Sequence, residues 1–287
     1  MNDISTVAVL GAGTMGHGIA HVCAAAGCQV RLQDIAEDAV EGALGRIRRN
    51  LDKGVELAKV TAQERDEALD LIRAATDVAD AVAGADLVVE AAPESLDLKI
   101  AIFAEVAAHA PAHAFLATNT SSLSIEKIAA GLPDPGRFIG LHFFNPVHLM
   151  KLVEVVWGPA TSQATTDAAV AFVRRLGKEP VIVRDAPGFA SSRLGIVLGM
   201  EAIRMVEEDV AKPEDIDKAM ELGYRHPMGP LKLTDLVGLD VRLGIAEYLH
   251  ETLGSEAFRP PELLRRMVAE GRLGKKTGRG FYDWSDA

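Results

Sequence analysis

The sequence lacks the features of a membrane, secreted or disulfide-rich protein. Its apolar runs are broken by Gly, Asp, Glu or Arg well before the ~20 residues that a bilayer span requires, so no membrane helix is expected. Cys23 and Cys28 are too few for a disulfide framework and do not have the spacing of a zinc site. The first residues contain no basic region followed by an apolar one, so no secretory signal is expected. These absences predict a cytoplasmic protein.

The sequence also has fewer positive than negative residues. The chain has 30 Lys and Arg against 41 Asp and Glu, a net charge of −11, so we expect neither nucleic acid nor a membrane surface as a partner. Apolar residues make up 48% and charged residues 25%, values that exclude a disordered chain and a coiled-coil rod. At about 100 to 200 residues per domain, a length of 287 predicts two domains.

The first part of the chain alternates short β-branched runs with longer helical patterns. This rhythm is typical of an α/β fold, in which a doubly wound, mostly parallel sheet is covered by helices on both faces. The expected strands are Thr6–Leu10, Gln29–Asp34, Asp86–Glu90, Ala114–Thr118, Phe138–Leu141, Leu152–Val156 and Pro180–Val183. The expected helices include Leu44–Val55, Ala62–Arg73, Leu98–Ala110 and Thr166–Leu176.

The remainder of the chain, after Asp185, shows no strand pattern. We therefore expect one domain over residues 1–184 and a second, all-helical domain over residues 185–287. Its first helical stretch is apolar on more than one side and must be covered on several sides. That stretch is either the central helix of the small domain or, in part, a homodimer interface, and the two readings are compatible. The expected helices are Ser191–Glu208, Pro213–Leu222, Leu239–Leu253 and Pro261–Glu270.

A glycine-rich loop joins the first expected strand to a helical pattern over Gly18–Ala26. In this context Gly11, Gly13 and Gly16 fit the dinucleotide fingerprint, which needs a tight turn, close approach to a pyrophosphate and close helix packing. Asp34 ends the next strand, 23 residues after Gly11, where a carboxylate accepts hydrogen bonds from ribose hydroxyls and repels a 2′-phosphate. NAD is therefore favoured over NADP. In the alternative reading, Asp34 only caps the following helix.

A histidine and a carboxylate interrupt two apolar strand patterns. His142 ends the run that begins at Phe138, and Glu154 lies inside the apolar run over residues 152–157. An unpaired charge buried there would cost several kcal/mol, so Glu154 needs a partner. With His142 as that partner, the carboxylate would fix the imidazole tautomer and leave the other ring nitrogen to exchange a proton with a substrate. The alternative is a core histidine with satisfied hydrogen bonds.

Other polar residues also follow strand ends. Ligands of open parallel sheets bind beyond the carboxyl ends of the strands, where Ser121 and His142 both lie. Residues 119–122 (Asn-Thr-Ser-Ser) also read as a capping turn for the next helix, and Glu90 and Glu94 follow another strand. The chain has no Gly-x-Ser-x-Gly elbow, so a hydrolase triad is unsupported.

A metal site is not expected. His17 and His21 are four residues apart on one helix, which invites a metal-binding reading. The residue after His17 is Gly18, however, not the Glu of a zinc protease motif, and the sequence suggests no third ligand.

Taken together, the motifs along the chain resemble those of the L-3-hydroxyacyl-CoA dehydrogenases of the 3-hydroxybutyryl-CoA type. The resemblance implies a Rossmann-like NAD-binding domain, a helical domain that binds substrate and dimerises, and an acyl-CoA between them. It also implies reversible oxidation of the L-3-hydroxyl to a 3-keto group, with a hydride passing to NAD. The matching segments are residues 11–16, 119–122, 142–146 (His-Phe-Phe-Asn-Pro), 226–230 (His-Pro-Met-Gly-Pro) and 274–282 (Gly-Lys-Lys-Thr-Gly-Arg-Gly-Phe-Tyr).

The resemblance also implies roles for single residues. It makes His142 the catalytic base, Glu154 the carboxylate that orients it and Ser121 the hydroxyl that bonds the reacting oxygen. The implied substrate contacts are Ser121, His142 and Asn145, together with Asn50 and Lys53 toward CoA. The implied cofactor contacts are Gly11, Ala12, Gly13, Thr14, Met15, Gly16, Asp34, Glu94, Lys99, Asn119, Ser121, Asn145 and Lys276.

One departure from the family pattern concerns the fourth polar residue of its active site. The family usually has Asn before Arg193, and Ser192 fills that catalytic position here. A hydroxyl reaches less far than a carboxamide, so water or a shifted substrate fills the gap, or the preferred acyl group differs. Two alternatives stay open: a 3-hydroxyadipyl-CoA dehydrogenase of aromatic-acid catabolism, and a non-catalytic NAD-binding relative.

Overall fold

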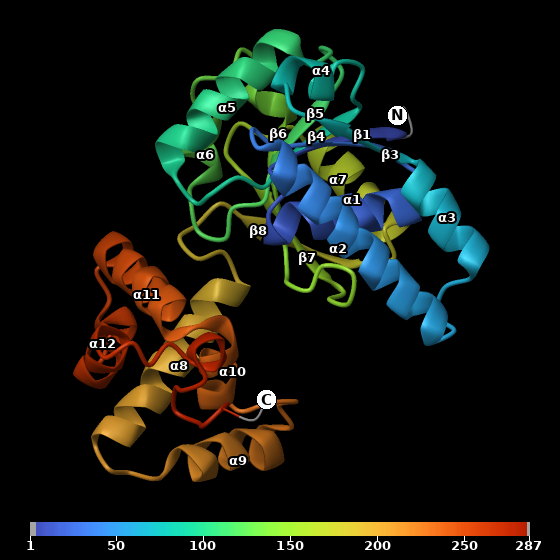
Figure 1. Cartoon of the computed structure of the whole chain (residues 1–287). Coiled ribbons are helices and arrows are strands. Elements are labelled where there is room, and N and C mark those ends of the chain that lie inside the picture. Colours follow the sequence, from blue (N-terminus) through green and yellow to red (C-terminus); the bar gives the residue numbers. More distant parts are fainter. Residues whose placement is uncertain (1–3, 286–287) are drawn as a thin grey trace. The chain divides into compact units, whose positions relative to one another are not determined.

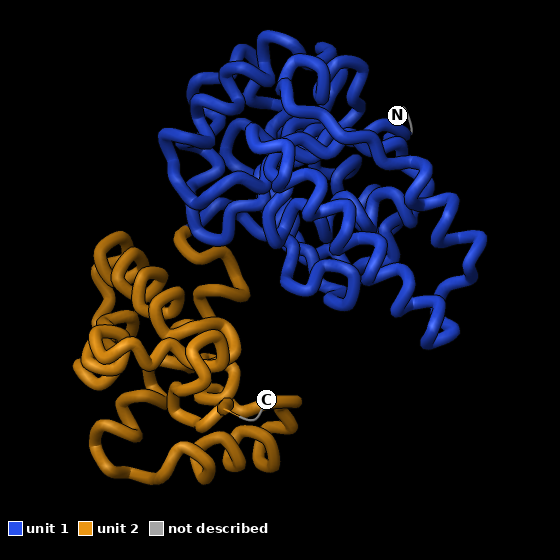
Figure 2. Tube along the Cα trace, in the orientation of Figure 1, with its two compact units in different colours: residues 1–186 blue, residues 187–287 orange. Residues whose placement is uncertain are grey.

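The structure is a computed structural model and describes residues 4–285. The chain forms two compact units, divided after Ala186 (Figure 2). The first unit contains a sheet with helices around it, and the second is helical (Figure 1). Among the described helices, none is both long and apolar enough to cross a bilayer.

One sheet forms the frame of the first unit. In the described residues its eight strands run in the order β3-β2-β1-β4-β5-β6-β7-β8, and β6 and β7 are its antiparallel pair. The predicted doubly wound, mostly parallel sheet is thus confirmed. The strands are β1 (Thr6–Leu10), β2 (Gln29–Gln33), β3 (Ile72–Ala75), β4 (Leu87–Glu90), β5 (Phe115–Thr118), β6 (Phe138–Phe143), β7 (Leu152–Trp157) and β8 (Glu179–Arg184).

Two layers of helices cover this sheet (Figure 1). α1, α2 and α7 pack on one face, and α4, α5 and α6 pack on the other. α3 lies beside α1 and α2. The helices are α1 (Thr14–Ala25), α2 (Glu37–Glu56), α3 (Ala62–Asp70), α4 (Val78–Val82), α5 (Leu96–His109), α6 (Ile125–Ala129) and α7 (Gln163–Arg175).

Side chains alternate between the two faces of the sheet along β6, and this alternation places His142 on the face covered by α5 and α6. Phe138 packs edge-on against Phe103 of α5, with 4.7 Å between the ring centroids. Gly140 faces the same way, because a Cβ placed there would lie 2.8 Å from Ile125 Cδ1 of α6. His142, two residues further on, therefore shares this face of the sheet.

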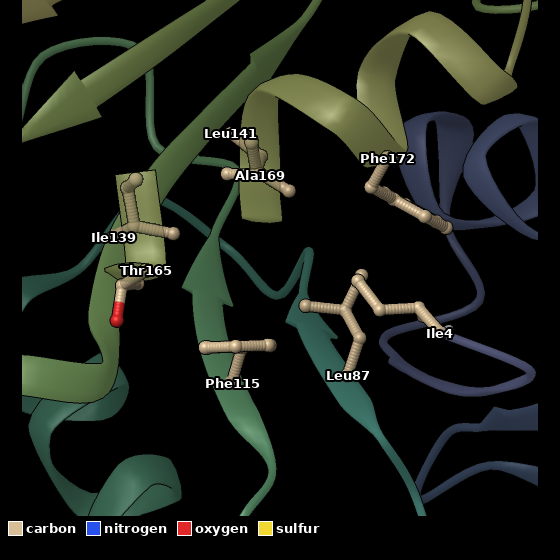
Figure 3. Close-up of a pocket in the computed structure, with 8 residues that line it drawn as sticks. All are labelled: Ile4, Leu87, Phe115, Ile139, Leu141, Thr165, Ala169 and Phe172. Carbon is tan, nitrogen blue, oxygen red and sulfur yellow. The ribbon is translucent and has the colours of Figure 1, made fainter. Parts of the chain in front are cut away.

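A small void lies between the sheet and α7 (Figure 3). Its volume is about 10 Å³, close to the least space that one water molecule needs. Apolar side chains such as Leu87, Leu141 and Phe172 form its wall, and the hydroxyl of Thr165 is already bonded to the Gly136 carbonyl at 2.8 Å. The void is therefore a packing defect of the core and not a ligand site.

Some predicted element boundaries are wrong. The helix expected over Ala62–Arg73 ends at Asp70, and Ile72–Ala75 forms strand β3 at the sheet edge. Only the two end residues of β3 are buried, so the alternating pattern that would identify a strand is missing. β6 runs two residues beyond its predicted end, which places His142 inside the strand.

The second unit contains five α-helices in its described residues, one of which, α10, was not expected. α8 is its central helix: Ile196, Met200 and Ile203 are buried in the core, as one of the two readings predicted. Leu194 on the same helix is 68% exposed, and a homodimer interface there stays a prediction. The helices are α8 (Ser191–Glu207), α9 (Pro213–Tyr224), α10 (Pro230–Val237), α11 (Leu239–Leu253) and α12 (Glu262–Ala269).

Candidate active site

The glycine-rich loop between β1 and α1 has the geometry of a phosphate-binding turn. Gly11 has a φ of +97°, and a Cβ there would lie 2.7 Å from the Ala91 oxygen. Gly16 packs closer still, since its Cβ would lie 1.7 Å from the Gly11 oxygen. Gly13, the N-cap of α1, faces open space and provides no capping side chain. The first-turn N–H groups of α1 are therefore available to an anion.

Asp34 connects this loop to the start of α2. Its Oδ2 accepts a hydrogen bond from Ala12 N at 2.8 Å, and its Oδ1 accepts one from Ala36 N at 3.2 Å. The second contact lies just before α2, whose N-cap is Ala36 and which has no side-chain cap, so Asp34 does not cap this helix as the alternative held. The first contact holds the glycine loop itself. Asp34 thus has a structural role in addition to any contact with a ribose.

A pocket of about 680 Å³ opens beside the glycine loop. Gly13 and Asp34 line it, together with the loop that follows β4. In the sheet β1 and β4 are neighbours where the strand order reverses, and such switch points are where open α/β sheets bind ligands. The open space at Gly13, the uncapped helix α1 and the carboxylate of Asp34 fit the pyrophosphate and ribose of a dinucleotide.

A buried ion pair fixes the β4 side of this pocket. The Glu90 carboxylate is fully buried and accepts hydrogen bonds of 2.6 Å from Lys99 Nζ, Ala92 N and Thr118 Oγ1. Lys99 is only 1% exposed. Its ammonium also donates to the Ala92 carbonyl at 3.2 Å and so holds the loop after β4 from the protein interior. A direct cofactor contact by Lys99 stays a prediction. Sequence reasoning noted Glu90 only as a strand end, because nothing in the sequence pairs it with Lys99.

Glu94 holds the loop that follows β5. Its Oε1 accepts hydrogen bonds from Thr120 Oγ1 at 2.5 Å and from Ser121 N at 3.0 Å. Its Oε2 lies 3.7 Å from Lys99 Nζ. Glu94 therefore links the loop that follows β4 to the backbone of Ser121, one of the predicted catalytic residues.

His142 and Glu154 form a buried pair on neighbouring strands. The antiparallel register of β6 and β7 places them directly opposite each other. His142 Nδ1 donates a hydrogen bond of 2.7 Å to Glu154 Oε2, and the two side chains are 8% and 1% exposed. Glu154 therefore has His142 as its partner, as the sequence predicted. The bond also fixes the tautomer with the proton on Nδ1, so Nε2 is the ring atom that can accept a proton.

Asn119 ties the ends of β5 and β6 together. Its side-chain oxygen accepts a hydrogen bond of 2.9 Å from Phe143 N, the residue after His142. The loop that carries Ser121 is thereby fixed beside the strand that carries His142. The carboxamide of Asn119 is engaged in this bond, and its cofactor contact stays a prediction.

The remaining predicted residues lie on other elements. Lys53 forms an exposed ion pair of 2.8 Å with Glu56 on α2, and Lys276 forms one of 2.5 Å with Asp240 in the second unit. Ser192 lies in the first turn of α8. The ligand contacts of Asn50, Lys53, Asn145, Ser192 and Lys276 stay predictions.

Two histidines, His21 of α1 and His148 of the loop after β6, lie against each other. The ring of His21 stacks on that of His148, with 5.3 Å between centroids. Burial, with nearby His148, His17 and Lys178, lowers the pKa of His21 to about 4. In the part of the chain that the structure describes, no group of three or more His, Cys, Asp or Glu has a metal-binding arrangement.

Two family models cover almost the whole chain. The model described as "3-hydroxyacyl-CoA dehydrogenase, NAD binding domain" matches residues 6–186, and that of the C-terminal domain matches residues 188–284. A probable 3-hydroxybutyryl-CoA dehydrogenase of Bacillus subtilis is 45% identical over 284 residues, 99% of each chain. The 3-hydroxyadipyl-CoA dehydrogenase of Escherichia coli is also 45% identical, over 99% of this chain and 60% of the relative.

A solved structure has the same fold throughout. The crystal structure of (S)-3-hydroxybutyryl-CoA dehydrogenase from Ralstonia eutropha matches with a TM-score of 0.95 and 42% identity, covering 99% of this chain and 100% of that one. The similarity therefore includes both compact units.

Proposed function

The chain belongs to the 3-hydroxyacyl-CoA dehydrogenase family, and we propose that it reversibly oxidises short-chain L-3-hydroxyacyl-CoA esters, such as 3-hydroxybutyryl-CoA, to 3-ketoacyl-CoA. As a member it is an NAD-dependent oxidoreductase acting on a CH–OH group. The observation that carries the proposed residue roles is the buried 2.7 Å hydrogen bond between His142 and Glu154.

His142 acts as the general base in this proposal. The proton of the 3-hydroxyl passes to Nε2 as the C3–O bond becomes a carbonyl and the hydrogen on C3 departs with its electron pair. The hydride acceptor would be supplied by the nicotinamide of NAD, held by the glycine loop and Asp34. The imidazolium that forms remains hydrogen-bonded to Glu154, whose negative charge stabilises it. A base positioned in this way contributes about 10²–10⁴-fold to the rate.

Ser121 is the proposed donor to the reacting oxygen. Its backbone N–H is held by Glu94 at 3.0 Å, and Asn119 fixes its loop beside β6. A hydroxyl held in place before the reaction stabilises changing charge on an oxygen without reorganisation. These contacts position the backbone of Ser121 for that role. Its hydroxyl donates to Glu94 Oε1 at 3.4 Å and would turn from that carboxylate to the reacting oxygen.

The dinucleotide is proposed to lie in the pocket beside the glycine loop. The N–H groups at the start of α1 would bind its pyrophosphate, and Asp34 would accept hydrogen bonds from the ribose hydroxyls. The same carboxylate disfavours a 2′-phosphate. The proposal also includes a homodimer and the acyl-CoA and cofactor contacts predicted for Asn50, Lys53, Asn145, Ser192 and Lys276.

The decisive assay follows NADH absorbance with acetoacetyl-CoA and longer 3-ketoacyl-CoA esters. We expect NADH-dependent reduction, fastest with the short esters, and little activity with NADPH. The absence of turnover with every thioester would contradict the enzymatic assignment and favour a non-catalytic NAD-binding role. A preference for NADPH would instead contradict the role of Asp34.

A second candidate is oxidation of 3-hydroxyadipyl-CoA. The equal identity to the Escherichia coli enzyme of that name supports it. The same assay with 3-oxoadipyl-CoA separates the two. A kcat/KM higher for this dicarboxylic ester than for acetoacetyl-CoA would favour the second candidate, and the reverse order would favour the first.

A further inference from the structure

The cofactor pocket has an apolar wall along α5 that ends in a carboxylate. Leu98, Ala101, Ile102 and Glu105 all line the pocket. Their spacing of three, four and seven residues places them on one face of the helix. Lys99, Phe103 and Val106 are buried on a different face of the same helix. The α5 side of the pocket is therefore apolar for about one turn and acidic in the next.

The opposite wall is apolar as well. Ile35 lines the pocket with Val78, and its side chain is 92% exposed, the highest value among the exposed large apolar residues of the described chain. Asp34, which precedes Ile35, is where the adenosine ribose is expected. A planar base attached to that ribose would lie between Ile35 and the α5 wall and remove this apolar surface from water.

Glu105 differs from the other carboxylates near this pocket. Glu90 and Glu94 are held by Lys99, Thr118, Thr120 and the backbone. Within the described residues the carboxylate of Glu105 makes no hydrogen bond or ion pair, and Glu105 lines the pocket further along α5 than the apolar side chains. Its carboxylate is thus a hydrogen-bond acceptor available to a ligand in the pocket.

We propose that Glu105 accepts a hydrogen bond from the 6-amino group of adenine and makes the pocket selective for adenine over hypoxanthine dinucleotides. Adenine carries an N–H donor at position 6, whereas hypoxanthine carries an oxygen there, which a carboxylate repels. The shape of the apolar walls does not distinguish the two bases, because they are nearly the same size. The selectivity then resides in Glu105. This inference rests on the proposed binding of NAD in this pocket.

The test compares binding of two reduced dinucleotides to the full-length protein. NADH and its hypoxanthine analogue are titrated separately, and binding is read from the fluorescence of the reduced nicotinamide, which is the same in both. We expect the wild-type protein to bind NADH about tenfold more tightly, as for a hydrogen bond to a charged acceptor at a partly exposed site. Glu105→Ala should bring the two dissociation constants together, mainly by weakening NADH binding.

Two further variants refine the comparison. In Glu105→Gln the carboxamide can turn its NH2 toward the hypoxanthine oxygen, so the preference should fall below that of the wild type. Asp97→Asn removes the same charge from an exposed position on the same helix, one that does not line the pocket, and should leave the preference unchanged.

The outcomes are separable. Equal affinities in the wild-type protein, or an undiminished preference in a folded Glu105→Ala variant, would overturn the role of Glu105. A wild-type protein that binds neither dinucleotide would instead contradict the proposed function itself.

Discussion

Both units of this molecule bury carboxylates, but each unit satisfies them with different partners. In the first unit Glu154 bonds to an imidazole, and Glu90 bonds to an ammonium, a hydroxyl and one backbone N–H. In the second unit Asp217 and Asp235 bond mainly to backbone N–H groups. A buried carboxylate needs partners in either case. The partner's chemistry decides whether the pair can also transfer a proton.

Asp235 shows the purely structural case. It accepts hydrogen bonds of 2.9 Å from Phe281 N and Tyr282 N and one of 2.8 Å from the indole N–H of Trp284. Gly280 lies so close that a Cβ would be 2.1 Å from an Asp235 oxygen. The motif at residues 274–282, which carries part of the family resemblance, therefore folds around a carboxylate.

Asp217 holds the other motif of the second unit, residues 226–230, in place. It accepts hydrogen bonds from Leu231 N and Lys232 N at the start of α10, and a Cβ on Gly229 would lie 2.2 Å from it. The hydroxyl of Tyr282 also donates to it at 2.7 Å. Burial, this hydrogen bond and the charge of Asp217 raise the pKa of Tyr282 well above its ordinary value. The two motifs of the second unit are thus joined through their carboxylates.

The largest effect should come from the pair that we propose transfers a proton. His142→Gln should lower kcat about 10²–10⁴-fold, because the proposed general base is lost while the strand pairing remains. The dissociation constant of NADH, measured by fluorescence titration, should change little. A variant with the full wild-type rate would contradict the role of His142. The buried Glu154 would then be only structural, like the buried carboxylates of the second unit.

A smaller effect should come from the structural carboxylate. Asp235→Ala leaves two backbone N–H groups and an indole N–H without their acceptor and should lower the free energy of unfolding by about 3 kcal/mol. Urea unfolding of the second unit can be followed by Trp284 fluorescence in a Trp157→Phe background, since the chain has 2 tryptophans.

The control for this experiment is Asp283→Ala. Asp283 lies in the same segment but is exposed, and among the described residues its carboxylate accepts hydrogen bonds only from Ser285. We expect it to change the unfolding free energy by less than about 0.5 kcal/mol, as for most surface substitutions. Equal effects of the two substitutions would show that burial of Asp235 does not matter.

The smallest effect concerns His21, a buried group that has no carboxylate partner within residues 4–285. Burial lowers its pKa to about 4 in the folded protein, against 6.5 as its ordinary value, so between these values the unfolded chain binds the extra proton. Its contribution to stability is complete above pH 6.5 and is lost as the pH falls toward 4. At pH 5 the loss should be about 2 kcal/mol.

The measurement is urea unfolding at pH 7.5 and pH 5 for wild type and His21→Leu. The variant should lose less stability on acidification, because the titrating group is gone. His109→Leu, an exposed histidine on α5, is the matched control and should behave as wild type. An identical pH dependence in His21→Leu and wild type would contradict the depressed pKa.

The sequence predicted most strands of the sheet, because their β-branched runs are long enough to show a pattern. It missed β3, in which only the two end residues are buried and no alternation appears. It also missed α10, which begins at Pro230, the last residue of the motif at residues 226–230. The pairing of His142 with Glu154 could be predicted from the sequence, because a carboxylate buried in an apolar strand needs a partner.

What the sequence by itself determined was the order of elements, the glycine loop and the identity of the groups that require partners, since these depend on local spacing and on the cost of burial. The tertiary structure decided which partner each group has. Lys99 turned out to hold Glu90 behind the cofactor pocket, and Glu105 to lie on the pocket wall. Such contacts depend on strand register and on the rotation of a helix against the sheet, which local periodicity does not encode.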